Sequence, residues 1–199
     1  MLSEKKIREI VREILNETSK KTIQDISDLV LFKIRNGLII LYNIKTKLPI
    51  GYIGFGNLKD GAHPVYSIYS DNGYGPLLYE LAMTDVYPNG ITLDDSSPTS
   101  NEAMNVWKKF YLRSDVKKEP INRVEKTWKE KEMIMNCKGD SECLKKIREV
   151  LDLHDLKFIY NLGKQVLNKL IENGIEYLNK NPELDIDDMI EYINVKYDR

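Results

Sequence analysis

Cysteine and histidine are scarce in this chain. Two cysteines and two histidines occur in 199 residues, whereas a structural zinc site takes four closely grouped Cys or His ligands. We therefore predict no metal site. Cys137 and Cys143 lie six residues apart, and in a reducing compartment we expect two unpaired thiols here rather than a disulfide.

An excess of charge of one sign is also missing. Thirty Lys and Arg residues face 31 Asp and Glu residues, a net charge of -1, which argues against nucleic acid as the main partner. No apolar run reaches the roughly 20 residues that span a bilayer, and residues 1–6 lack the apolar core of a secretory signal. We predict a cytoplasmic protein with no membrane partner.

Apolar residues, at 42% of the chain, are sufficient for a real core. The length fits one ordinary domain with an extension. Residues 3–16 predict an amphipathic helix that must dock on the body or on a partner, because a helix this short is unstable alone. We divide the chain into an N-terminal helical segment (1–28), a central core (29–116) and a C-terminal helical extension (117–199).

Four strands are predicted in the central core, over 29–34, 38–44, 49–55 and 63–69. Tight turns such as Asn36-Gly37 separate them, and consecutive strands with short turns form an antiparallel meander. Helices are predicted from Pro76 to Val86 and after Ser100. Beyond Glu119 we expect only helices, over 128–137, 144–160, 162–179 and 186–197. The predicted fold is α+β, a mainly antiparallel sheet flanked by helices.

The stretch from Tyr66 to Leu81 combines a strand, a glycine turn and a helix start. Pro76 suits a first helical position, because its missing N–H would have no partner within the helix. The free amides of such a turn and the positive end of the helix dipole favour an anion, and a pyrophosphate fits best. The alternative is a tight turn that uses glycine for steric reasons alone.

Two motifs in this order resemble the GCN5-related N-acetyltransferase (GNAT) superfamily. In that family a β-meander leads to the loop Arg/Gln-x-x-Gly-x-Gly/Ala and a helix; here Ser70-Asp71-Asn72-Gly73-Tyr74-Gly75 stands at that place, with Leu77 and Leu78 behind it. The family's next motif, Asn-x-x-Ala-x-x-x-Tyr, aligns with residues 100–107. Serine replaces the first residue of each motif, at Ser70 and Ser100, and Trp107 replaces the tyrosine.

The resemblance implies a GNAT-like sheet with acetyl-CoA as co-substrate. The pyrophosphate of acetyl-CoA would bind the loop between strand and helix, at Ser70, Asn72, Gly73, Tyr74, Gly75 and Leu77. The wider pattern Gly-Tyr-Gly-Pro-Leu-Leu-Tyr, Ala-x-x-x-Trp and Arg-Ser-Asp-Val is similar to acetyltransferase-like proteins encoded by phages. The host cytoplasm or the virion would then be the location.

Acetyl transfer also needs a base for the amine and an acid for the leaving thiolate. The resemblance implies a tyrosine as the acid, and Tyr111 is the nearest candidate; its alternative role is a core aromatic at a helix end. Asp94 and Asp95 are candidate bases at a strand end, and their alternative role is to cap the next helix. We expect His63 to be structural and Trp107 to belong to the core.

Two classes of function follow from this sequence. The first is an acyl-CoA N-acetyltransferase that modifies an unidentified amine of a protein, a nucleobase or a small molecule. The second is a GNAT-like scaffold without catalysis that serves as a phage structural or interaction protein. In the second case the N-terminal helix or the C-terminal helices would contact a protein partner.

Overall fold

The computed structural model describes residues 28–34, 37–71, 73–93, 99–121, 141, 153 and 155–197. Several predictions concern residues outside these ranges and are not tested by the structure. They are the helix over 3–16, the turn at Asn36, the loop residue Asn72, the candidate bases Asp94 and Asp95, the helix over 128–137, and the two cysteines Cys137 and Cys143.

A single seven-stranded sheet organises the described part of the chain. Its strand order is β1-β2-β3-β4-β5-β7-β6. Neighbouring strands are antiparallel except β4 and β5, which are parallel. The strands are β1 (Leu29–Ile34), β2 (Leu38–Asn43), β3 (Leu48–Phe55), β4 (His63–Ser70), β5 (Ile91–Leu93), β6 (Lys117–Pro120) and β7 (Leu156–Ile159).

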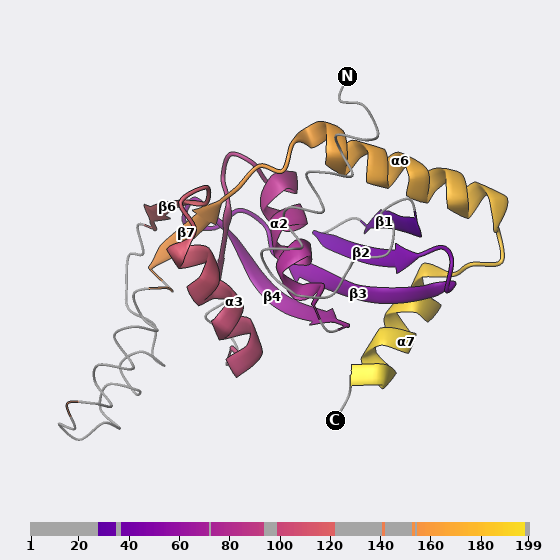
Figure 1. Cartoon of the computed structure of the whole chain (residues 1–199), viewed down its shortest axis with the longest axis horizontal. Helices are drawn as coiled ribbons and strands as arrows, with labels where there is room; N and C mark the ends of the chain where they lie inside the picture. The colour runs from indigo at the N-terminus through magenta and orange to yellow at the C-terminus, as the bar shows by residue number, and fades with distance from the viewer. Residues whose placement is uncertain are drawn as a thin grey trace.

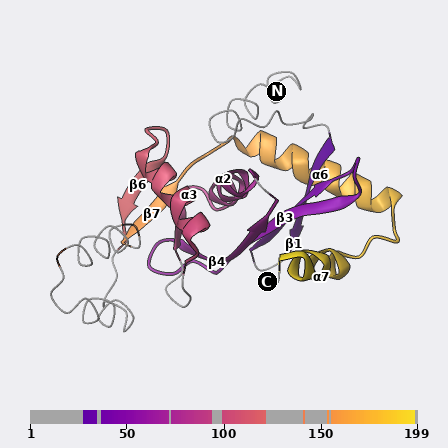
Figure 2. The same cartoon turned by 60° about the horizontal axis from the view of Figure 1, so that its bottom comes forward.

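Helices cover both faces of the sheet. The described helices are α2 (Gly75–Asp85), α3 (Asn101–Leu112), α6 (Lys164–Lys180) and α7 (Ile186–Tyr197). Side chains of α2, α3 and α6 pack into one core cluster, and those of α7 pack into a second cluster. Figures 1 and 2 show α2 and α6 on one side of the sheet and α7 on the other. The arrangement is therefore three-layered, as expected when both faces of a sheet are apolar.

The alternating side chains of β2 explain why this sheet needs two helical layers. Ile39 and Leu41 face the α2 side, and Ile40 and Tyr42 face the α7 side. All four are at most 1% exposed. Successive residues of a strand point to opposite faces, so a strand that is apolar at every position must be buried on both sides. The antiparallel meander predicted for the first four strands is confirmed.

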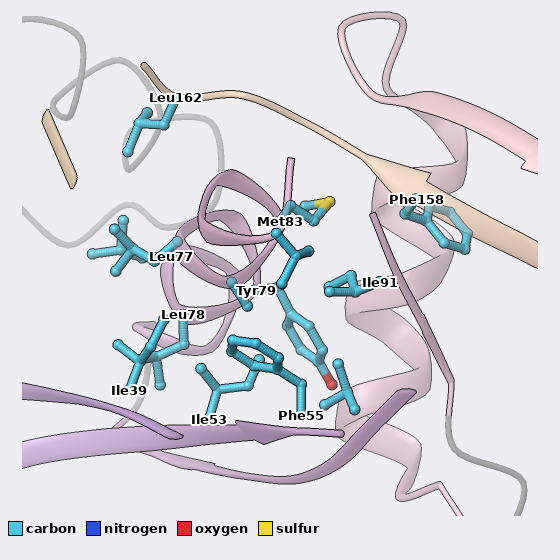
Figure 3. Close-up of a cluster of buried hydrophobic side chains, with 14 of the residues drawn as sticks. Ile39, Ile53, Phe55, Leu77, Leu78, Tyr79, Met83, Ile91, Phe158 and Leu162 are labelled. Atoms are coloured by element: carbon cyan, nitrogen blue, oxygen red, sulfur yellow. The ribbon is translucent and has the colours of Figure 1, made fainter. Parts of the chain in front are cut away.

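Helix α2 forms the centre of the larger core. Its residues from Leu77 to Thr84 are all buried, which is typical of a helix enclosed on every side. Figure 3 shows Leu78 and Tyr79 of α2 above Ile39, Ile53 and Phe55 of the sheet. The strand β4, the helix α2 and the strand β5 follow one another directly, so the turn between β4 and α2 is fixed at both ends by buried elements.

The expectation of an all-helical extension over 117–199 is wrong at two places. Residues 117–120 form β6. Residues 156–159 form β7, and they lie within the stretch predicted as a helix over 144–160. Phe158 of β7 is fully buried and pairs with Ile91 of β5. The aromatic Phe158 and the β-branched Ile159 favour an extended strand where a partner exists, and that partner is distant in the sequence. The sheet thus crosses the predicted boundary at residue 116.

Candidate functional site

The turn between β4 and α2 is built from short-range backbone contacts. The amide of Asp71 donates to the carbonyl of Ile50 at 2.8 Å, which continues the pairing of β4 with β3. The amide of Tyr74 donates to the carbonyl of Asp71 at 3.1 Å, and Gly73 has a φ of 96°. Because this φ is in the left-handed region, glycine is the residue that the turn requires at position 73.

Three amides of the turn and the helix start have no hydrogen-bond acceptor among the described residues, namely those of Gly73, Gly75 and Leu77. No side chain caps α2, and its first turn carries no acidic residue. The first amides of a helix are unsatisfied by its own carbonyls and attract anions. The amide of Tyr74, by contrast, is already used within the turn.

Space at this helix start is open on the side of Gly75. A Cβ atom built on Gly75 would meet only the hydroxyl oxygen of Ser70, at 3.4 Å, an ordinary van der Waals contact. The turn thus brings Ser70 and Gly75 close together, and their role in binding stays a prediction. Leu77 contributes through its amide alone, because its side chain is 2% exposed in the core.

The described pairing of β4 with β5 is short. Its last pair joins Val65 to Leu93, the last described residue before the gap at 94–98. The register with β3 shifts between Gly54 and Phe55, which leaves Tyr66 as the extra residue of a β-bulge.

The predicted catalytic residue Tyr111 occupies the last turn of α3 and is 49% exposed. Ser100 caps the opposite end of α3 by accepting a hydrogen bond from the amide of Ala103 at 3.2 Å, about 16 Å from Tyr111 along the helix axis. The role of Tyr111 stays a prediction, as do those of Asp94 and Asp95, which lie outside the described residues.

Two residues expected to be structural have that role. Trp107 is 1% exposed, and its ring lies 4.9 Å from both Tyr79 and Phe158, measured between centroids. His63 stands at the first position of β4, about 23 Å along the strand from Ser70. Its Nδ1 lies 2.9 Å from the carbonyl oxygen of Gly56.

An ionic cluster with a buried carboxylate joins α2 to the segment that follows α3. Glu80 of α2 is fully buried and pairs with the guanidinium of Arg113. Arg113 also donates to both carboxylate oxygens of Asp115, at 3.0 and 2.6 Å, and lies over the rings of Phe110 and Tyr160. Hydrogen bonds from Arg113 lower the pKa of Asp115, and burial raises the pKa of Tyr160 to about 12. The Arg-Ser-Asp-Val segment therefore packs against the core through Arg113.

Helix α7 brings a lysine to the candidate site that sequence reasoning did not identify. The Nζ of Lys196 lies 2.6 Å from Oδ1 of Asp71, although 125 residues separate them. The hydroxyl of Tyr52 in β3 donates to Oδ1 of Asn194 at 3.1 Å. No short-range pattern in the sequence relates α7 to the turn, because only packing on the sheet brings them together.

The fold and this turn define the class of the molecule. It is an α+β protein with a seven-stranded, mostly antiparallel sheet, two helical layers and a glycine turn at the one parallel strand pair of the described chain. A scan of protein-family models, a search of curated proteins and a search of solved structures each found no match.

Two further findings concern the described residues alone. None of their helices is long and apolar enough to cross a membrane. Among the same residues, no group of three or more His, Cys, Asp and Glu side chains is placed to hold a metal ion.

Proposed function

We propose that this chain binds acetyl-CoA at the turn between β4 and α2 and transfers the acetyl group to an amine, as GNAT proteins do. The observation that carries the proposal is the set of amides at Gly73, Gly75 and Leu77, which have no acceptor among the described residues. A diphosphate is a suitable acceptor for several convergent amides at a helix start.

The reaction balances with the groups that the chain offers. The amine nitrogen attacks the thioester carbonyl, the C–N bond forms and the C–S bond breaks, while one proton leaves the amine and one reaches the thiolate. A backbone N–H of β4 would stabilise the negative charge on the carbonyl oxygen. Asp94 and Asp95 remain the candidate bases and Tyr111 the candidate acid.

A pair of isosteric variants tests the binding step. A ligand selective for the folded state raises the unfolding midpoint, so millimolar CoA or acetyl-CoA should raise it for the wild type. Gly75→Asp places a carboxylate beside the diphosphate and should abolish the shift. Gly75→Asn has the same shape without the charge and should keep part of it. No shift for the wild type would refute the proposal.

The scaffold without catalysis is the second candidate, and the exposure of Tyr111 favours it. Its side chain is half exposed in the last turn of α3, whereas a catalytic acid acts in a site that excludes water. An assay of free thiol release from acetyl-CoA, with protein lysates, nucleosides and polyamines as acceptors, separates the two candidates. Binding of CoA without thiol release for any acceptor class would favour the scaffold, with a protein partner on its helices.

A further inference from the structure

The turn between β4 and α2 carries a negative charge at the place where an anion is proposed to bind. Asp71 provides the carbonyl that accepts from the amide of Tyr74, so its side chain starts within the same turn. Burial raises the pKa of Tyr74 at the start of α2, and the charge of Asp71 raises it further. An uncompensated carboxylate here would repel a diphosphate.

The turn has no cationic residue of its own. The six residues from Ser70 to Gly75 include one acid and no base. Serine stands at position 70, where the GNAT superfamily has arginine or glutamine. The sequence alone therefore predicts a turn that offers a phosphate no positively charged side chain. The structure supplies the missing charge from the other end of the chain.

Helix α7 carries that charge. Lys196 lies in its last turn, 2.6 Å from Asp71, and its side chain is 34% exposed. A further contact holds this end of α7 on the sheet, because Asn194 accepts a hydrogen bond from Tyr52 of β3 at 3.1 Å. Within α7, the Nζ of Lys196 lies 5.8 Å from the ring centroid of Tyr192. The ammonium group is therefore positioned at the turn and still reaches solvent.

We propose that Lys196 is the cationic residue of the CoA site, which neutralises Asp71 and attracts the phosphates of the ligand. This inference rests on the proposed function and assigns α7 to the same site. Helix α7 then has a role beyond covering the sheet, because it brings the ammonium group of Lys196 to the carboxylate of Asp71.

Titration calorimetry with CoA at low ionic strength tests the assignment. Removing one positive charge several ångströms from a diphosphate should weaken binding roughly three- to tenfold, so Lys196→Met should raise the Kd by that factor. Asp71→Asn removes the repelling charge, and the double variant should bind within about twofold of the wild type. The matched control is Lys180→Met, which breaks a comparable 2.6 Å surface pair with Glu176 in α6 and should leave the Kd unchanged.

The outcomes separate the two proposals. If the wild type does not bind CoA, the proposed function fails and this inference fails with it. If the wild type binds and Lys196→Met binds equally well, only the role of Lys196 is refuted. An equal loss of CoA affinity in Lys196→Met and Lys180→Met also refutes the role of Lys196, because the effect would then come from the net charge of the protein. Unfolding midpoints without ligand show whether each variant is folded.

Discussion

At the scale of single residues, Gly174 has a role that helix propensity does not describe. It lies inside α6, where glycine costs up to about 1 kcal/mol relative to alanine. A Cβ atom at this position would lie 2.2 Å from the carbonyl oxygen of Leu31 in β1. Glycine therefore allows α6 to pack directly on the backbone of the edge strand.

We expect Gly174→Ala to lower the free energy of unfolding by about 1–3 kcal/mol, the usual cost of overpacking. Propensity alone predicts a gain of up to about 1 kcal/mol, so the sign of the change decides between the two effects. Urea denaturation measures it. Glu172 in the same helix is exposed, so Glu172→Ala should change the free energy of unfolding by no more than about 0.5 kcal/mol. A more stable Gly174→Ala would contradict the close packing of α6 and β1.

The pair of Glu80 and Arg113 gives a second prediction at this scale. Breaking a buried ion pair on one side leaves a buried charge and costs about 3–5 kcal/mol. Arg113→Met should therefore destabilise strongly, because Glu80 is fully buried. Adding Glu80→Met should recover much of that loss, since an apolar pair of similar volume is often neutral. Chemical denaturation of both single variants and the double variant gives the coupling energy, and simple additivity would refute the buried pair.

At the scale of elements, the sequence predicts structure well wherever the signal is local. The four strands of the meander, α2 and α3 follow from alternating or helical apolar spacing and from the turns between them. The strands β6 and β7 were not predicted because their sequence signals are weak or fit a helix equally well. Residues 156–159 end a stretch whose apolar residues recur at helical spacing. They form a strand because they pair with β5, some 65 residues earlier in the chain.

The predictions for the candidate site also separate into local features and long-range features. Ser70, Gly73 and Gly75 were predicted as site residues because a strand, a glycine turn and a helix follow one another along the chain, and the structure shows that turn. Lys196 was not predicted, since its distance from Asp71 is set by the docking of α7 on the sheet.

The docking of α7 rests on few buried side chains, and a matched pair of variants tests it. Ile193 is fully buried, and Val195, two residues later, is 71% exposed. Ile193→Ala should cost about 2–5 kcal/mol, the range for a truncated core isoleucine. Val195→Ala should cost no more than about 0.5 kcal/mol. Urea denaturation measures both, and equal effects would show that α7 does not lie on the sheet as described.

At the scale of the whole molecule, the sheet joins segments that composition separates. The strands β1–β5 lie before residue 94, and β6 and β7 lie within the segment that composition marks as a helical extension. The rings of Trp107 in α3 and Phe158 in β7 are in contact, with their centroids 4.9 Å apart and their planes tilted by 55°. The larger core therefore contains side chains from both sides of the predicted boundary, and neither part buries its apolar surface without the other.

This arrangement predicts how the chain responds to truncation. A chain that ends at residue 116 loses β6, β7, α6 and α7. It would expose Trp107, the α6 side of β1 and the whole second core face, so it should not unfold cooperatively. A chain that ends at residue 182 keeps all seven strands and α6 and loses only α7. It should retain a cooperative transition at a lower midpoint, because the cluster of Val30, Phe32 and Ile40 loses its cover. Near-ultraviolet circular dichroism of the buried aromatic residues, followed through thermal unfolding, distinguishes the two chains. A stable, cooperatively folded chain of residues 1–116 would mean that the meander is an independent domain and that β6 and β7 only add to it.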